Sequence, residues 1–357
     1  MNISSARLGD LIGDAPVVAL GESAHHVREY HLVRHQLLHH LVDELGFTAL
    51  VLESGFSEGL AVTAWDGEGA FPDGALTYRF GRNAEMRDML AWARRRGVAY
   101  YGLDLPGDLA SMTPALDHLA TIHDIDAVRR TADKFASAYT MPALAAYRAL
   151  PQPERDALTV RLAELSARFA VEHRGAAEAR HELRLLVLLD QMLRAQAAGD
   201  FALNVRDAAM AETVDWVRAQ GHERVVVAAA NTHIQRVFPG LRVLGSHLAE
   251  QLGDDYVAIG LTAYGGATPT RRPAPDAPAG AETVTVPLDP PVPGSVEDFL
   301  GPRPAIADLR PLRGRPGPDR IRLLDSYLEV PVADAFDVVV SIPEITPTAE
   351  GVWRGGR

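Results

Sequence analysis

The segment Gly21 to His26, with the sequence GESAHH, places a carboxylate and an imidazole three residues apart in a short turn. Across such a turn Glu22 can hydrogen-bond to His25 and hold the ring in one orientation. A neutral imidazole held in this way accepts a proton near pH 7, as a general base must. The alternative interpretation is that Ser23 caps a helix, and that both histidines are solvated residues of its first turn.

Polar residues also lie at the ends of three other short apolar runs. Glu53 follows FTALVL, Asp104 ends GVAYYGLD, and Asn231 and His233 follow ERVVVAAA. The carboxyl ends of parallel strands meet at one edge of a sheet, where side chains converge over a common crevice. We therefore predict that these four side chains lie near the turn at residues 21–26.

The apolar runs that must position these residues are short and rich in β-branched side chains. Their hydrophobicity is continuous rather than alternating, which is typical of strands covered on both faces. We predict an α/β fold, with a mainly parallel mixed sheet flanked by helices. The predicted strands are residues 15–22, 47–54, 97–105, 223–233, 255–265 and the FDVVVSIPEI segment near the C-terminus.

Between the third and fourth predicted strands the sequence has almost no strand signal. Residues 106–221 contain mostly helix formers, so we expect a helical insertion or cap there, with residues 1–105 and 222–357 forming the α/β core domain. Residues 265–293 are rich in Gly, Pro, Ala and Thr, which predicts an exposed connection. One more strand is expected after it.

Composition excludes several classes of function. The 357 residues include 35 Lys and Arg against 47 Asp and Glu, a net charge of −12 that opposes non-specific binding to nucleic acid or anionic lipid. The absence of Cys excludes disulfides, thiolate zinc sites and cysteine nucleophiles. No apolar stretch approaches the ~18 residues of a membrane helix, and no signal sequence is evident. We expect a cytoplasmic protein with a small-molecule partner and no cofactor.

The order of these motifs resembles the erythromycin esterases and their wider superfamily. That family characteristically carries a G-E-x-x-H turn after the first strand, and the similarity spans roughly residues 15–348. The motifs that carry it are GESAH, a helix bearing Arg34, LGFTALVLESGFSEG with Glu53, NAEMRDMLAWARR, YYGLDL, RDAAMAETVDWV from Arg206, the strand ending in Asn231 and His233, GSHLAEQLGDDYVAIGLTAYGG and FDVVVSIPEITPT.

The resemblance implies a cleft between an α/β core and a helical subdomain that hydrolyses a macrolide lactone without a required metal. His25 would be the general base that activates water, and Glu22 would orient it. Arg34 and Glu53 would complete the polar centre, and His233 would face them from the fourth strand end. Arg34 or a donor at a strand end would meet the developing oxyanion charge.

Four further residues are predicted to contact the substrate: His26, Asp104, Asn231 and Arg206. The sequence departs from the esterases at two positions. Ala230 stands where they carry the first histidine of His-Asn-x-His, and His26 stands where the resistance enzymes usually have Gly. Both departures argue against macrolide hydrolysis, and the missing imidazole at position 230 favours an alternative in which the same fold serves natural-product biosynthesis, by cyclisation, elimination or acyl transfer.

A serine esterase is a second alternative. The segment GFSEG matches G-x-S-x-G directly after a predicted strand, and Ser57, Asp104 and His233 follow the chain order of an α/β-hydrolase triad. The match falls unusually early in the fold, and so short a pattern often arises by chance. A binding protein without catalysis is a third alternative, which the number of convergent ionisable groups disfavours.

A metal site is a further alternative. His31, His35 and His39 are spaced four apart along one predicted helix, so three imidazoles could face a single ion. No carboxylate lies near them in an H-E-x-x-H arrangement. We therefore predict that these histidines are surface or packing residues, and that no metal is required.

Overall fold

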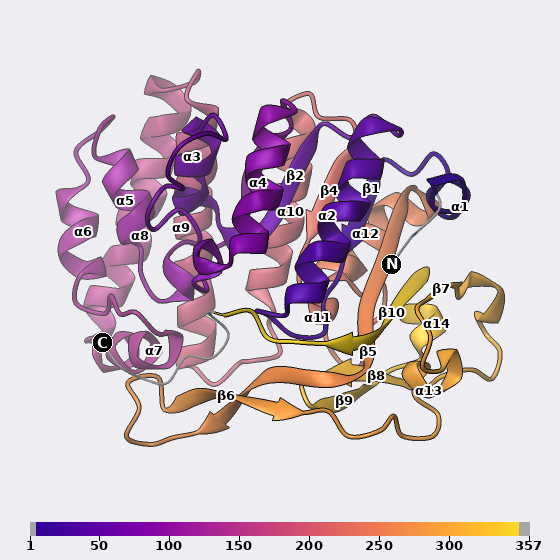
Figure 1. The fold of residues 1–357 in the computed structure, drawn as a ribbon. Helices are drawn as coiled ribbons and strands as arrows, with labels where there is room; N and C mark the ends of the chain where they lie inside the picture. Colours follow the sequence, from indigo (N-terminus) through magenta and orange to yellow (C-terminus); the bar gives the residue numbers. More distant parts are fainter. Residues whose placement is uncertain (1–4, 350–357) are drawn as a thin grey trace.

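The computed structural model describes residues 5–349, in which helices cover both faces of a central sheet (Figure 1). The strands are β1 Val17–Leu20, β2 Ala49–Gly55, β3 Ala99–Asp104, β4 Val225–Ala228, β5 Tyr256–Pro273, β6 Ala281–Pro287, β7 Ala305–Asp308, β8 Arg320–Leu323, β9 Ser326–Glu329 and β10 Val338–Ile345.

The helices in chain order are α1 Ser5–Ile12, α2 Arg28–Asp43, α3 Phe56–Ala64, α4 Ala84–Arg95, α5 Thr113–Leu119, α6 Asp126–Ala132, α7 Thr140–Ala149, α8 Gln152–Glu172, α9 Ala177–Ala197, α10 Val205–Ala219, α11 Asn231–Ile234, α12 Leu244–Leu252, α13 Val296–Leu300 and α14 Val332–Ala335. Short 3-10 helices are η1 Phe80–Arg82, η2 Gly107–Leu109, η3 Gly253–Asp255 and η4 Arg310–Leu312. None of the described helices combines the length and the apolar character that a membrane crossing needs.

The sheet confirms the predicted fold class. Its strand order is β3-β2-β4-β1-β5-β10-β7, with β6 paired to β5, and all pairings from β3 to β10 are parallel while β7 and β6 run antiparallel. Ala228 at the end of β4 lies opposite both Leu20 of β1 and Leu52 of β2. The polar residues that follow these strands therefore start from one level of the sheet.

Successive strand residues point to opposite faces, which explains the continuous hydrophobicity of the runs. Val18 and Leu20 belong to the core cluster formed with α1, α2 and α4, whereas Val17 and Ala19 belong to the cluster formed with α10 and α12. Both faces of β1 are fully covered, so the strand is held in one register.

The helices between β3 and β4 build a third hydrophobic cluster, which α5 to α9 share (Figure 1, left). Helix α10 joins this cluster to the sheet, because Ala209 packs into it while Met210 and Val214 pack against the strands. The first turn of α10 thereby reaches the same end of the sheet as the polar strand ends.

The prediction of an exposed connection over residues 265–293 is wrong for much of its length. Strand β5 continues to Pro273 and pairs with β6 over seven residues. Thr268 and Thr270 are buried within it, and short β-branched side chains suit such a ribbon despite the Gly and Pro around them. Strand β7 and the β8–β9 hairpin were not predicted from the sequence either.

Candidate active site

The turn after β1 brings Glu22 and His25 together as their spacing predicts. Nδ1 of His25 lies 2.7 Å from Oε1 of Glu22. A carboxylate can only accept a hydrogen bond, so Nδ1 carries the hydrogen and Nε2 is left as the basic nitrogen. Glu22 is 1% exposed, whereas the His25 side chain is 32% exposed, so the imidazole is the member of the pair that a substrate can reach.

Arg34 lies beneath this pair and holds Glu22 from behind. Its Nη1 is 2.9 Å from Oε2 of Glu22, and its other nitrogens donate to the carbonyl oxygens of Leu20, Gly21 and Ala229. Because Arg34 is itself 1% exposed, it positions Glu22 and cannot contact a substrate oxyanion. Of the two oxyanion partners expected from the sequence, Arg34 or a donor at a strand end, this burial disfavours Arg34.

Glu53, at the end of β2, connects His25 to His233. Oε1 of Glu53 lies 3.8 Å from Nε2 of His25 and 3.3 Å from Nε2 of His233, while its Oε2 accepts a hydrogen bond of 2.6 Å from the backbone N–H of Ala230. The other nitrogen of His233 lies 2.7 Å from Oδ1 of Asp207 in the first turn of α10. His233 is therefore clamped between two carboxylates.

Arg206, the neighbour of Asp207, joins α10 to the ends of β2 and β3. Its guanidinium donates to both carboxylate oxygens of Asp104 and to Oε1 of Glu53, at 3.1 Å for the latter. The hydroxyl of Tyr78 donates to Asp104 at 3.0 Å and accepts from Arg206 at 2.9 Å. Two sequence-predicted residues, Asp104 and Arg206, are thus salt-bridged to each other within the centre.

An aromatic wall fixes the orientation of the His25 ring. Tyr78 stacks on it with ring centroids 5.7 Å apart, and Phe80 meets it edge-on at 5.1 Å. Tyr78 and Arg79 both have positive φ angles, of 54° and 60°, a backbone conformation that residues other than Gly rarely adopt. Such strain persists only where surrounding contacts enforce it, and the hydrogen bonds of Tyr78 supply those contacts here.

Opposing effects set the protonation states. Burial alone would raise the pKa of Glu22, but Arg34 and His25 outweigh it and lower that pKa to about 2. Burial would lower the pKa of His25, yet the charge of Glu53 and the hydrogen bond to Glu22 raise it above 6.5. Burial would also lower the pKa of His233, but the charges of Glu53 and Asp207 outweigh it and raise that pKa to about 10. The ring of His233 is therefore an imidazolium at neutral pH.

Asn231 and His26, two of the residues predicted to contact the substrate, form hydrogen bonds with other residues of the protein. Nδ2 of Asn231 donates to the carbonyl of Leu261, and its Oδ1 accepts from the Leu261 N–H, so Asn231 holds β5 and its amide is not free for substrate. A Cβ on Gly21 would lie 1.9 Å from that Oδ1, which explains the glycine. Nδ1 of His26 accepts a hydrogen bond of 3.0 Å from Asn83 at the rim of the aromatic wall.

The structure has neither the geometry of a serine triad at Ser57 nor that of a metal site at His31, His35 and His39. Ser57 lies in the first turn of α3, and its hydroxyl makes no hydrogen bond to Asp104 or His233, whose polar atoms are used elsewhere. His31 is buried against Phe80, whereas His35 and His39 lie together against Trp92. Within residues 5–349 these three imidazoles do not form a group of ligand atoms close enough to share an ion.

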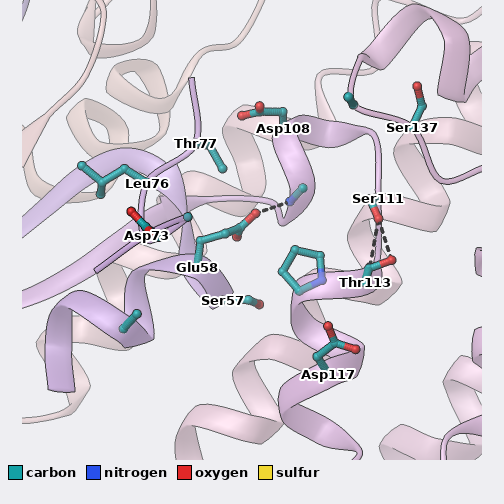
Figure 2. A pocket seen from close by; sticks show the side chains of 15 residues that line it. Ser57, Glu58, Asp73, Leu76, Thr77, Asp108, Ser111, Thr113, Asp117 and Ser137 are labelled. Atoms are coloured by element: carbon teal, nitrogen blue, oxygen red, sulfur yellow. Dashed lines mark hydrogen bonds between the residues drawn. The ribbon is translucent and has the colours of Figure 1, made fainter. Parts of the chain in front are cut away.

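A cavity of about 620 Å³ lies beside the centre (Figure 2). The residue before Tyr78 lines it, and Asp108 on its wall accepts a hydrogen bond from the Tyr78 N–H. Most of the side chains that line it are hydroxyl or carboxyl groups. Among its carboxyls, burial raises the pKa of Glu58 to about 7, and Oε1 of Glu58 accepts from the N–H of Gly107.

Sequence reasoning missed Tyr78 and Asp207. Tyr78 lies in a loop without a recognisable motif, and only its contacts reveal its role. Asp207 directly follows Arg206 in the first turn of a helix, where an acidic residue is ordinarily explained by the helix dipole. The only usable signal was the adjacency of the two charged residues at the start of RDAAMAETVDWV.

Comparisons with known proteins agree with this architecture. A model of the erythromycin esterase family matches residues 42–345. The chain is 28% identical over 399 aligned positions to an erythromycin esterase type II from Escherichia coli, covering 97% of this chain and 93% of that protein. It is 26% identical to an erythromycin esterase type I from the same organism, covering 94% and 92% of the two chains.

Solved structures share the fold. A histidine-to-asparagine mutant of the erythromycin esterase EreC in its open conformation superimposes with a TM-score of 0.79 at 23% identity, covering 96% of this chain and 94% of that one. A succinoglycan biosynthesis protein gives a TM-score of 0.76 at 21% identity, covering 96% and 91%. From the extent of the family match, the chain belongs to the erythromycin esterase family and is an esterase-like enzyme.

Proposed function

We propose that the protein cleaves an ester, lactone or related acyl group of a hydrophobic, oxygen-rich natural product, with His25 as the general base. The observation that carries this proposal is the hydrogen bond of 2.7 Å between Glu22 and the exposed imidazole of His25. Arg34 keeps Glu22 ionised, Glu22 fixes the tautomer, and Nε2 of His25 is left to accept a proton.

In this mechanism a water molecule near Nε2 of His25 attacks the acyl carbon and gives its proton to that nitrogen. The carbonyl oxygen takes up the negative charge of the tetrahedral intermediate. Arg206, with 20% of its side chain exposed, is the cation of the centre that such an oxyanion can approach, because both ring nitrogens of His233 already face the carboxylates of Glu53 and Asp207. When the intermediate collapses, His25 returns the proton to the departing alcohol oxygen.

The names of the relatives support a macrolide-type lactone as the substrate class. The adjoining cavity is large enough to hold a substituent of such a molecule, and its hydroxyl and carboxylate groups suit a part that bears hydrogen-bonding groups. No metal or cofactor enters the proposal, because the polar centre already supplies its own base and cations.

The test is the His25→Ala variant, assayed on a panel of lactone and ester natural products. Loss of a general base should lower turnover by about 10²–10⁴. His39→Ala removes an imidazole that packs on Trp92 away from the centre and serves as the matched control, with turnover unchanged. Near-native turnover by a folded His25→Ala protein would refute the assignment.

Ala230 favours a second candidate on the same fold. Its N–H is bonded to Glu53, so the position adjoins the centre, and its methyl group leaves room where the esterases carry an imidazole. A hydroxyl, amine or carbon acid of the substrate could then take the place of water, since a positioned intramolecular group has a high effective molarity. The reaction would be a biosynthetic cyclisation, elimination or acyl transfer.

This candidate predicts that the purified protein leaves 14-membered macrolide lactones unhydrolysed. Ala230→His should then raise any trace of hydrolysis, because the added imidazole can help to bind water beside Glu53. Efficient ring opening by the unchanged protein would instead select the esterase proposal. Product analysis by mass spectrometry distinguishes the two, because hydrolysis adds the mass of water and an internal acceptor does not.

A further inference from the structure

Three side chains far from His25 form a group that can ligate a metal ion. His123 lies in the connection between α5 and α6, while Glu172 ends α8 and His173 follows it. One ligand atom from each residue lies within 4.8 Å of the other two, and within residues 5–349 this is the group of three that meets that condition. We propose that His123, Glu172 and His173 bind a divalent transition-metal ion.

The imidazoles are already oriented for this role. Phe169, fully buried one turn before His173, contacts both rings, with centroids 5.7 Å from His123 and 4.9 Å from His173. The two imidazoles face each other edge-on at 5.8 Å. A shared aromatic neighbour restricts both rings, so a metal would have little rotamer freedom to remove on binding.

Protein groups leave these nitrogens without strong partners. Nε2 of His173 is buried with no hydrogen-bond partner. The polar neighbour of His123 is Glu172, whose carboxylate oxygen lies 4.0 Å from Nδ1, too far for a hydrogen bond. A buried polar atom without a partner requires an explanation, and a bound ion that draws in the ring nitrogens provides one.

The donor set indicates the class of ion. Two imidazoles and one carboxylate suit Zn²⁺ and its neighbours Co²⁺, Ni²⁺ and Cu²⁺, whereas Mg²⁺ and Ca²⁺ prefer oxygen ligands. Tetrahedral coordination at about 2.0–2.1 Å brings ligand atoms to about 3.3 Å from one another. The side chain of Glu172 is 48% exposed, so its carboxylate can move toward the two imidazoles.

The group is separate from the candidate active site. Ile122, next to His123, and Gly175, two residues after His173, line a cavity of about 340 Å³ together with Gln220, which follows the last turn of α10. Arg206 lies in the first turn of the same helix, so its length of roughly 20 Å separates the two places. A metal here would join the end of α8 to the α5–α6 connection and stabilise the helical insertion without entering the reaction.

The experiment uses the full chain without an affinity tag. Titration with Zn²⁺ should give saturable binding of one equivalent and raise the midpoint of thermal unfolding. His123→Ala and His173→Ala should each lose both effects, and Glu172→Gln should retain weakened binding. With Cu²⁺, electron paramagnetic resonance should show coupling to two imidazole nitrogens, a readout on the unchanged protein that does not depend on how well the variants fold.

The matched control is His39→Ala. His35 and His39 lie one helical turn apart with ring centroids 4.8 Å from each other, so they are the rival pair for an added ion. His39→Ala should leave the tight equivalent intact, and all variants should keep the turnover of the unchanged protein. Loss of binding in His39→Ala but not in His123→Ala, or no saturable binding at all, would overturn the proposal.

Discussion

At the level of single residues, charge balance explains why His25 is the group that can exchange a proton. With His25 neutral, the carboxylates of the centre outnumber its cations by one, and protonation of His25 balances them. The strongly shifted pKa values of Glu22 and His233 keep both of these partners ionised through the neutral range. The carboxylates are Glu22, Glu53, Asp104 and Asp207, and the cations are Arg34, Arg206 and His233.

Glu53→Gln should shift the acid limb of the pH–rate profile. General-base activity requires neutral His25, so kcat/KM falls as the pH drops through the pKa of this residue. The charge of Glu53 raises that pKa, and removing it should move the limb to lower pH. Glu68→Gln, on the exposed loop after α3, should leave the limb in place. If the acid limb of the Glu53→Gln variant stays in place, the charge of Glu53 does not raise the pKa of His25.

Tyr78→Phe should destabilise the fold while keeping the ring that stacks on His25. The lost hydroxyl removes one hydrogen bond from Asp104 and one from Arg206, at a cost of about 1–3 kcal/mol in the free energy of unfolding. Urea denaturation measures this loss, and Tyr139→Phe, whose hydroxyl is outside the centre, is the control. Turnover should fall further in Tyr78→Ala, and equal turnover in the Phe and Ala variants would deny the ring a positioning role.

The sequence predicted those site residues that follow strands. Glu22, His25, Glu53, Asp104 and His233 come from strand ends, and a parallel sheet brings such ends together whatever the intervening chain does. Residues supplied by helices and loops could not be placed in this way. Arg34 came from family resemblance alone, and Tyr78 and Asp207 depend on packing between distant segments.

At the level of elements, close backbone approach sets the position of the β3 end. Gly102 lies in β3 where β2 turns into α3, and a Cβ there would be 2.2 Å from the carbonyl oxygen of Gly55 and 2.6 Å from Cα of Phe56. These are backbone atoms that no side-chain rotation can move away. Glycine at this position therefore allows β3 to carry Asp104 into the centre.

Gly102→Ala should lower the free energy of unfolding by about 1–3 kcal/mol, the usual cost of overpacking. Because Asp104 lies two residues further along the strand, turnover should fall as well. Gly9→Ala in α1 is the control, since its Cβ would meet nothing within 4 Å and a helical alanine is slightly favourable. Unchanged stability in Gly102→Ala would mean that β2 and β3 separate more easily than their packing indicates.

Sequence patterns predicted buried elements better than exposed ones. β1, β2 and β4 have continuous apolar sequences because helices cover both of their faces. The β5–β6 ribbon has a mixed, partly exposed pattern, with Gly and Pro that suggest a loop, so its pairing could be found only from the fold.

At the level of the whole molecule, the proposed metal group adjoins a cavity that Gln220 lines just after α10, whereas the first turn of α10 carries Arg206 of the candidate active site. Dialysis of the zinc-loaded protein against a chelator should therefore lower its midpoint of thermal unfolding and leave turnover unchanged. Arg34 and Arg206 already balance carboxylates of the centre, so no ion is needed there. Complete loss of turnover that only zinc or manganese restores would place a metal at His25 instead.

The strand order also determines when the chain can fold during synthesis. β1 lies between β4 and β5, so its neighbours in the sheet are encoded roughly 200 residues after it. At about 5–20 residues per second on the ribosome, this delay is on the order of 10–40 s. Throughout that time the nascent chain exposes β1 with its backbone hydrogen bonds unmade, a state that chaperones protect from aggregation. The Glu22–His25 turn is therefore among the first parts of the protein to be synthesised and among the last to be completed.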